Sequence, residues 1–162
     1  SSIKKGVFKV ADSQVATRWG NITDFKKFDL ITPNEKEARF SLADQDSSIS
    51  ELTRQLVSET KLKNLILKLG ERGVFSMGIK SSGFAVPTFT NKVVDAVGAG
   101  DALLAYSTLA LLTTKSVLVA SILGSAAAAC ECEYEGNIVI KPEQVITKIN
   151  SIQELSEYKI SN

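Results

Sequence analysis

The chain has 162 residues, of which 44% are hydrophobic and 23% charged, which is the composition of an ordinary soluble globular domain. Its net charge of +1 gives no electrostatic reason to expect nucleic acid or an anionic membrane as a partner. It contains no histidine, which excludes Ser-His-Asp and Cys-His nucleophilic schemes and the usual zinc sites within these residues. Any general base is therefore expected to be a carboxylate.

The sequence also carries signals about the compartment. No apolar run reaches the roughly 18 residues that a membrane-spanning helix needs, and the N-terminal residues lack the apolar core of a signal peptide. Cys130 and Cys132 are two residues apart on a predicted helix, so their side chains diverge and no disulfide is expected between them. We therefore expect a reduced, cytoplasmic protein.

The first part of the chain predicts short strands and two helices. The runs at 6–12 and 29–32 are predicted strands, and the second turns at Pro33 into a helix. Proline suits the first turn of a helix, because its missing N–H costs nothing there. Residues 47–61 form an amphipathic helix whose start carries a Ser-x-x-Glu capping-box pattern.

The rest of the chain predicts a hairpin, one more strand and three helices. The run "NLILKLG" is a strand stopped by Gly70, and "GVFSMGI" follows it closely enough to form a hairpin, with "GFAVPTF" as another strand. Helices are expected after Gly100, at 116–136 and at 141–149. Strands separated by helices of this length predict an α/β fold with a mostly parallel sheet and helices on both faces.

An acidic glycine turn precedes the first of these three helices, after a short β-type run at 92–94. The turn consists of Gly98, Ala99, Gly100 and Asp101. Its bare N–H groups and the positive end of the helix dipole form an anion site, beside which a carboxylate suits the role of base for a substrate hydroxyl. Alternatively, it is only a tight turn with Asp101 as a helix cap. A Walker A motif and a dinucleotide fingerprint do not fit its spacing.

Four segments, in order over roughly residues 7–145, resemble the ribokinase-like (PfkB) family of carbohydrate kinases. They are "LITPNEKEA", "LILKLGERGVF", "VVDAVGAGDALLA" and "GSAAAACECEYEG". Within the family, "ADSQ", "LITPNEKEAR" and "EYEGN" are most similar to the heptose-kinase-like branch. The resemblance implies the C-terminal half of a ribokinase-like three-layer α/β/α sandwich, so that residues 1–162 form a single partial domain.

The resemblance also implies an activity, namely the ATP-dependent phosphorylation of a hydroxyl on a sugar or sugar phosphate. Asp101 matches the catalytic base of the family. The anion hole for the phosphoryl group is matched by Gly98, Ala99 and Gly100. In the same way, the small residues from Ser125 onward match the adenine side of the nucleotide site, although helix–helix packing explains the alanines equally well.

Further positions match the family's metal and phosphate segments. Asn34 and Glu37 match an Asn-x-x-Glu that organises Mg²⁺ around the nucleotide phosphates; otherwise Asn34 is a helix N-terminal residue and Glu37 a solvated one. Asp95 matches an acid that supports a monovalent-cation site, but Ala96 replaces the usual threonine after it. The turn over the ribose and phosphates is matched by Gly70 and Gly73, and Lys68 stands where threonine is common and a cation can contact phosphate.

The part of such a kinase that forms the sugar pocket has no counterpart here. Family members are about twice this length, and their N-terminal half supplies that pocket. We therefore expect a C-terminal half that associates with itself or with a missing N-terminal half. Two alternatives remain: a nucleotide-binding regulatory module without catalysis, and a same-fold kinase of a nucleoside or vitamin precursor.

Overall fold

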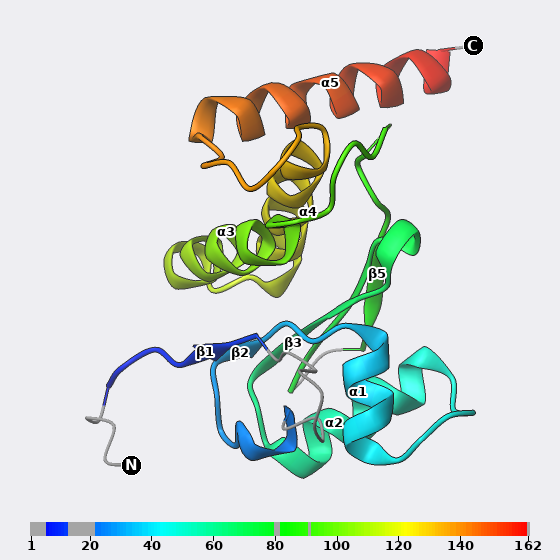
Figure 1. Cartoon of the computed structure of the whole chain (residues 1–162), viewed down its shortest axis with the longest axis vertical. Coiled ribbons are helices and arrows are strands. Elements are labelled where there is room, and N and C mark those ends of the chain that lie inside the picture. The colour runs from blue at the N-terminus through cyan, green and yellow to red at the C-terminus, as the bar shows by residue number, and fades with distance from the viewer. Residues whose placement is uncertain (1–5, 13–21, 80–81, 91, 162) are drawn as a thin grey trace. The chain divides into compact units, whose positions relative to one another are not determined.

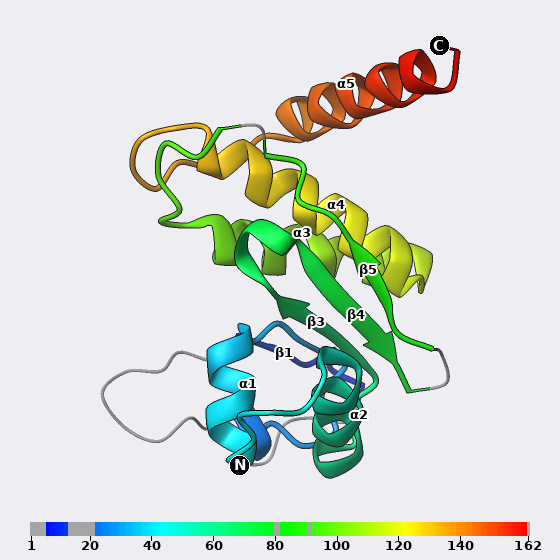
Figure 2. The ribbon, with the colours of Figure 1, turned by 90° about the vertical axis from the view of Figure 1, so that its right-hand side faces the viewer.

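The computed structural model describes residues 6–12, 22–79, 82–90 and 92–161. They fall into two units, of which unit 1 comprises the described residues up to Gly70 together with 74–85. Unit 2 comprises residues 71–73 and the described residues from Val86 onward. Figures 1 and 2 between them label the α-helices and strands of both units.

Unit 1 is built on a mixed sheet with the strand order β1–β2–β3–β4–β5. The strands are β1 (Val10–Ala11), β2 (Leu30–Ile31), β3 (Asn64–Lys68), β4 (Val74–Gly78) and β5 (Phe84–Val86), the last residue of which belongs to unit 2. β1, β2 and β3 are parallel, with Ile31 opposite Leu65, and β4 is antiparallel to β3. The predicted strands and the hairpin are confirmed, and the 3₁₀ turn η2 (Gly70–Arg72) joins the two hairpin strands.

Two helices of unit 1, α1 (Glu35–Leu42) and α2 (Ile49–Thr60), lie side by side (Figure 2). Asn34 begins α1, because its Oδ1 accepts the N–H of Glu37 at 2.9 Å while Glu37 Oε2 accepts the N–H of Asn34 at 2.7 Å. Pro33 therefore precedes the cap and is not in the first turn as expected; its carbonyl accepts the N–H of Lys68 at 2.8 Å.

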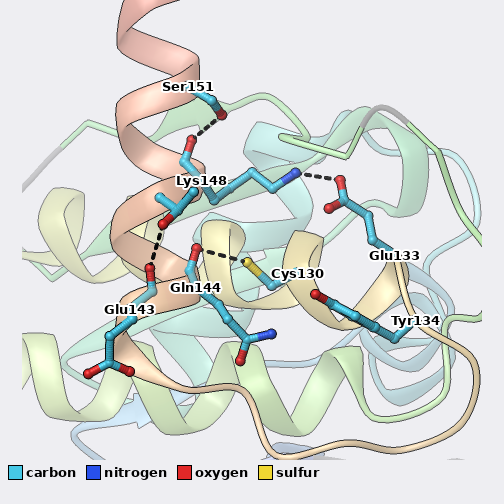
Figure 3. Close-up of a pocket in the computed structure, with 8 residues that line it drawn as sticks. Cys130, Glu133, Tyr134, Glu143, Gln144, Lys148 and Ser151 are labelled. Carbon is cyan, nitrogen blue, oxygen red and sulfur yellow. Dashed lines mark hydrogen bonds and ion pairs between the residues drawn. The ribbon is translucent and has the colours of Figure 1, made fainter.

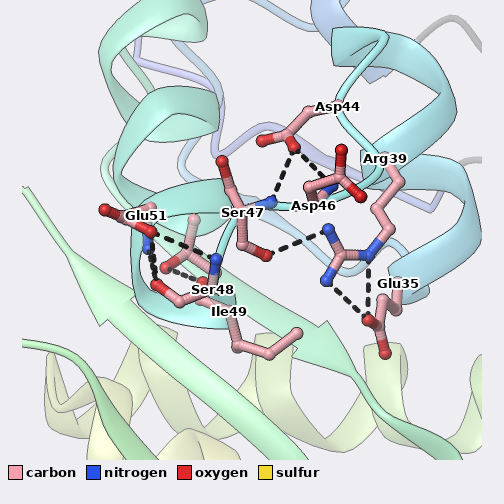
Figure 4. Close-up of polar contacts among 9 residues, drawn as sticks. Glu35, Arg39, Asp44, Asp46, Ser47, Ser48, Ile49 and Glu51 are labelled. Atoms are coloured by element: carbon pink, nitrogen blue, oxygen red, sulfur yellow. Dashed lines mark hydrogen bonds and ion pairs between the residues drawn. The ribbon is translucent and has the colours of Figure 1, made fainter.

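The start of α2 carries the predicted capping box. Glu51 donates its N–H to Ser48 Oγ at 3.2 Å, and Glu51 Oε2 accepts the N–H of Ser48 at 3.1 Å (Figure 4). In the loop before it, Asp44 accepts the N–H of Ser47 at 3.0 Å. Hydrogen bonding by Ser47 holds the pKa of Asp44 below its usual value. Arg39 pairs with Glu35 and also donates to the carbonyl of Ser47, which attaches the loop to α1.

The core of unit 1 lies between these helices and the sheet. Leu52 and Leu56 of α2 are fully buried, and Ile49 and Val57 pack against the same core, which confirms the predicted amphipathic helix. The other buried members of this core are Ile22, Ile31, Ala38, Leu62, Leu65 and Leu67.

Unit 2 is helical, with α3 (Ala99–Thr114), α4 (Val117–Cys132) and α5 (Pro142–Ser161). α3 and α4 pack closely, because Gly124 leaves no side chain in their contact: a Cβ there would lie 2.0 Å from Ser107 Oγ. Ser107 in turn donates to the carbonyl of Ala120 at 2.9 Å. A core of buried small and branched residues joins α4 to α5, namely Ala126, Ala127, Cys130, Ile140 and Val145.

Three expectations for unit 2 were wrong in detail. Residues 92–94 form no strand; instead Val94 donates its N–H to the carbonyl of Cys132 at 2.7 Å. α4 ends at Cys132 rather than near Gly136, because the N–H groups of the next two residues bond back to its last turn. α5 extends twelve residues beyond the expected end at position 149, to Ser161. No helix among the described residues is long and apolar enough to cross a membrane.

Candidate active site

The glycine turn lies at the N-terminus of α3, as the sequence predicts. Gly98 is the N-cap in a left-handed conformation (φ +86°), and no side chain caps the helix there. The helical hydrogen bonds start with the N–H of Ala102, which donates to the carbonyl of Gly98 at 2.9 Å. The N–H of Ala99 donates to the carbonyl of Ala96 at 3.3 Å, and the rest of the first turn, with Gly100, presents backbone N–H groups at the positive end of a sixteen-residue helix. Asp101 lies exposed in this turn.

Asp95 fixes the segment that leads into the turn. Its Oδ1 accepts the N–H of Val97 at 3.0 Å, and its Oδ2 accepts the N–H of Gly136 at 3.1 Å. These backbone donors, from Val97 first and Gly136 second, hold the pKa of Asp95 below its usual value. Both carboxylate oxygens thus already serve the backbone of two loops of unit 2.

Two residues near the turn were not predicted from the sequence. A Cβ built on Gly98 would lie 2.5 Å from Glu131 Oε1 and 2.7 Å from Asn137 Oδ1, so both side chains lie directly behind the turn. In the sequence, Glu131 is the first of three acids in the run "CECEYEG", and its spacing does not distinguish it from the other two. The sequence predicts this segment only as the end of a small-residue helix whose earlier residues match the adenine side.

In unit 1, three polar residues lie where the parallel strands end. Lys68 Nζ contacts Asp12 Oδ1 at 2.9 Å and Oδ2 at 2.8 Å, with the side chains only 20% and 18% exposed. Lys68 also forms an isolated parallel bridge with Asn34. Ligands of open α/β sheets bind at this carboxyl edge. Asp12 was predicted as the end of a strand but not as a site residue, and Ser13 and Gln14 of the "ADSQ" segment lie outside the described residues.

The geometry of Asn34 and Glu37 limits how they can hold a metal. Asn34 is a helix N-cap, as the alternative interpretation had it, but Glu37 is 5% exposed and so is not a solvated residue. One oxygen of each already serves the capping box. No group of three or more acidic, histidine or cysteine side chains suited to a metal occurs among the described residues. Asn34 and Glu37 can therefore supply at most a part of the ligands of a Mg²⁺ ion. The other ligands would be waters and phosphate oxygens, as is common for this ion.

The remaining predicted residues lie in turns and in helix packing. Gly70 (φ +63°) and Gly73 (φ +82°) are both left-handed, and a Cβ on Gly73 would lie 2.2 Å from the carbonyl of Val86, so glycine is required there. Ser125 is 7% exposed, and its Oγ has no hydrogen-bond partner among the described residues. The alanines after it pack in the core of unit 2, which favours the packing interpretation for them.

The predicted residues belong to different units. Unit 1 contains Asn34, Glu37, Lys68 and Gly70, and unit 2 contains Gly73, Asp95, Gly98, Ala99, Gly100, Asp101 and Ser125. The structure thus brings together the glycine turn with Asp95 in one unit, and Asn34 with Lys68 in the other.

A separate cavity of about 340 Å³ opens between α4 and α5, and none of the predicted residues lines it (Figure 3). Lys148 and Glu133 form an ion pair in it, and Cys130 Sγ contacts the carbonyl of Gln144 at 3.5 Å. Burial raises the pKa of the Cys130 thiol, which disfavours the thiolate form. Both cysteines are free, as predicted.

The solved structures that resemble this chain define its class. Ribokinase from Thermotoga maritima matches with a TM-score of 0.74 and 27% identity, over 87% of this chain and 48% of that one. Arabidopsis thaliana ribokinase, solved in complex with ribose and ATP, also matches with a TM-score of 0.74, at 20% identity, over 86% of this chain and 46% of that one. The protein therefore has the predicted ribokinase-like α/β fold.

The sequence comparison identifies the family. The pattern of the pfkB carbohydrate kinases matches residues 3–144, and the chain belongs to this family. A curated relative, the Bifunctional protein HldE of Geobacter metallireducens, is 30% identical over 152 residues. The match covers 91% of this chain but 31% of that protein, so the chain spans about a third of such a relative's length. The shared name of the relatives is consistent with the heptose-kinase-like branch that the sequence resembles.

Proposed function

We propose that residues 1–162 are the nucleotide-binding, catalytic half of an ATP-dependent kinase that phosphorylates a hydroxyl of a sugar or sugar phosphate. Membership of the pfkB family supports this proposal, as does the order of the four motifs along the chain. The observation that carries it is the N-terminus of α3, where a helix without a side-chain cap begins at a left-handed glycine beside an exposed carboxylate. This combination suits phosphoryl transfer, which depends on positioning and on stabilising negative charge.

In the proposed reaction, the substrate hydroxyl attacks the γ-phosphorus as its bond to the β-phosphate oxygen breaks. Asp101 accepts the hydroxyl proton, since a carboxylate is the base that a chain without histidine can offer. The backbone N–H groups of Gly98, Ala99 and Gly100 stabilise the charge on the phosphoryl oxygens, that of Ala99 by exchanging its acceptor, the carbonyl of Ala96, for phosphate.

The resemblance to the family gives the other predicted residues roles toward the nucleotide, each within its own unit. Asn34 and Glu37 orient the waters of Mg²⁺, which neutralises phosphate charge when bound, and Lys68 contacts phosphate by exchanging its partner Asp12 for the nucleotide. Asp95 supports a monovalent cation through the loops that it joins. Two glycines and one serine match nucleotide-contacting positions of the family and are proposed for that role, namely Gly70, Gly73 and Ser125.

The substitution Asp101→Asn in the full-length protein tests the proposal. We expect turnover to fall about 100-fold or more, the usual contribution of a positioned base, while nucleotide affinity stays nearly intact. Steady-state kinetics with a sugar panel and calorimetric titration of ATP measure the two quantities. Glu135→Gln is the matched control, because this exposed acid lies in a loop of the same unit and loses the same charge. Near-normal turnover of Asp101→Asn would remove this residue from the catalytic role.

A further inference from the structure

Glu131 is a carboxylate in an unfavourable place. It is 1% exposed and lies in the last turn of α4, where the helix dipole disfavours negative charge. Oε1 accepts the N–H of Ile138 at 2.8 Å, but Oε2 has no hydrogen-bond partner and no ion pair among the residues that the structure describes. A buried carboxylate oxygen without a partner costs stability. The hydrogen bond to Ile138 explains Oε1 but not the unpartnered Oε2.

The carboxylate faces the turn that begins α3. A Cβ added to Gly98 would lie 2.5 Å from Glu131 Oε1 and 2.7 Å from Asn137 Oδ1. Gly98 is also left-handed, so the turn requires glycine for its conformation as well as for space. The Glu131 carboxylate therefore lies against Gly98, in the space that a side chain at this position would need.

Three segments of unit 2 converge at this point. The N–H groups of Val94 and Asp95 donate to the carbonyl of Cys132 at 2.7 and 3.3 Å. The N–H of Gly136 donates to Asp95 Oδ2 at 3.1 Å. Glu131 is the buried side chain among them, bonded to the loop at Ile138 and in contact with the turn at Gly98. A shift of the loop at Ile138 would therefore move the start of α3 through the Glu131 side chain.

We propose that Glu131 is a positioning residue that aims the N–H groups of the glycine turn. The inference rests on the proposed function of this turn as the anion hole. Glu131 does not contact the phosphoryl group; it acts through Gly98, which α3 uses as its N-cap in place of a capping side chain. A displaced turn would misalign the N–H groups of Ala99 and Gly100, and misplacement of about 1 Å in a reacting group can cost about 100-fold in rate.

Three variants of the 162-residue chain test whether the position of the turn depends on the size and hydrogen bond of the Glu131 side chain or on its charge. Glu131→Gln keeps the size of the side chain and an oxygen that accepts from Ile138, whereas Glu131→Ala removes both. Glu135→Ala is the matched control, because this exposed acid four residues away contributes the same charge. The first measurement is the backbone amide NMR spectrum of residues 98–100. The second is the affinity for ATP and for inorganic phosphate by calorimetry.

We expect Glu131→Ala to shift the amide signals of the turn and to weaken ATP and phosphate binding by about 10-fold or more. Glu131→Gln should restore the signals and most of the affinity, and Glu135→Ala should change neither. If Glu131→Ala does not fold, Glu131→Asp, which withdraws the carboxylate by one methylene, takes its place with the same expected shifts. Unchanged turn amides in a folded Ala or Asp variant overturn the inference. A wild-type chain that binds neither ATP nor phosphate contradicts the anion hole itself, while the amide signals still decide the positioning role.

Discussion

Asn34 and Glu37 show how one pair of side chains can serve both a helix and a candidate site. Their reciprocal hydrogen bonds, at 2.9 and 2.7 Å, satisfy two backbone N–H groups at the start of α1. The same two residues match the proposed magnesium segment, and Glu37 is too buried to be a solvated surface acid. Loss of activity on removing either side chain would therefore not distinguish a structural role from a metal role.

Glu37→Gln distinguishes the two roles, because glutamine keeps an oxygen for the N–H of Asn34 but loses the charge. We expect the magnesium requirement of activity to rise several-fold in the full-length protein, while the melting temperature changes little. A magnesium titration of turnover and a thermal melt measure the two effects. Glu51→Gln makes the same change in the capping box of α2, outside the proposed site, and should leave the titration unchanged. Identical magnesium curves for Glu37→Gln and wild type would leave Glu37 with the capping role alone.

At the scale of elements, the close contact of α3 with α4 is the feature that supports the glycine turn. Gly124 and Ser107 meet where the two helices approach, and Ser107 bonds to the carbonyl of Ala120 across the contact. Helices can approach this closely only where side chains are small, because packed interiors leave no spare volume. The run of small residues in α4 thus has a packing explanation that does not depend on a nucleotide.

Gly124→Ala tests that explanation. Its new Cβ would lie 2.0 Å from Ser107 Oγ and 3.0 Å from the carbonyl of Leu103. We expect a loss of about 1–3 kcal/mol in the free energy of unfolding, although alanine is the better helix former. Ser107→Ala removes the closest atom, so the double variant should lose less than the sum of the single variants. Urea denaturation of the four proteins measures this coupling, and strictly additive losses would show that the two residues do not meet.

At the scale of the whole molecule, the chain matches about a third of its curated relatives and about half of the solved ribokinases. Several large apolar side chains of unit 2 are exposed in it, among them Leu109 at 61%. Others among the described side chains on the helices of this unit are Leu112, Leu118 and Ile146. Leu109 and Leu112 are three residues apart on α3 and so share a face of it, and an exposed apolar face favours association with a partner or a second copy.

We therefore expect the isolated 162-residue chain to bind ATP or ADP weakly, to phosphorylate no sugar measurably, and to self-associate. Without a sugar pocket nothing holds a hydroxyl in line with the phosphoryl group, and such positioning can account for about 7 kcal/mol or more of barrier lowering. Calorimetry, a coupled assay against a sugar panel and light scattering test the three parts. Leu109→Glu should reduce association without changing ATP affinity, and Ser50→Glu, on another helix, is its control. Robust sugar phosphorylation by a monodisperse monomer would contradict the expectation.

Local patterns in the sequence were sufficient to predict most elements and the start of the candidate site. The capping box of α2, the β3–β4 hairpin and the glycine turn depend on residues a few positions apart, so their hydrogen bonds follow from short-range spacing. The capping box of α1 has the same spacing but was not predicted. The family motifs belong to this category as well, because each is a short segment that the sequence displays directly. Predictions were least accurate at the ends of helices, where α4 stopped early and α5 continued, because fraying ends depend on what packs against them.

Only the tertiary structure revealed the contacts between residues far apart in the chain. Lys68 meets Asp12 because parallel strands bring their carboxyl ends together, across 56 positions of sequence. Asp95 bonds Gly136 across 41 positions, and Val94 pairs with the end of α4 instead of forming the expected strand. Glu131 lies behind Gly98 for the same reason. A single sequence contains no measure of which distant side chains share a volume, since that depends on how the elements pack, and so the buried carboxylate behind the turn became visible only in the fold.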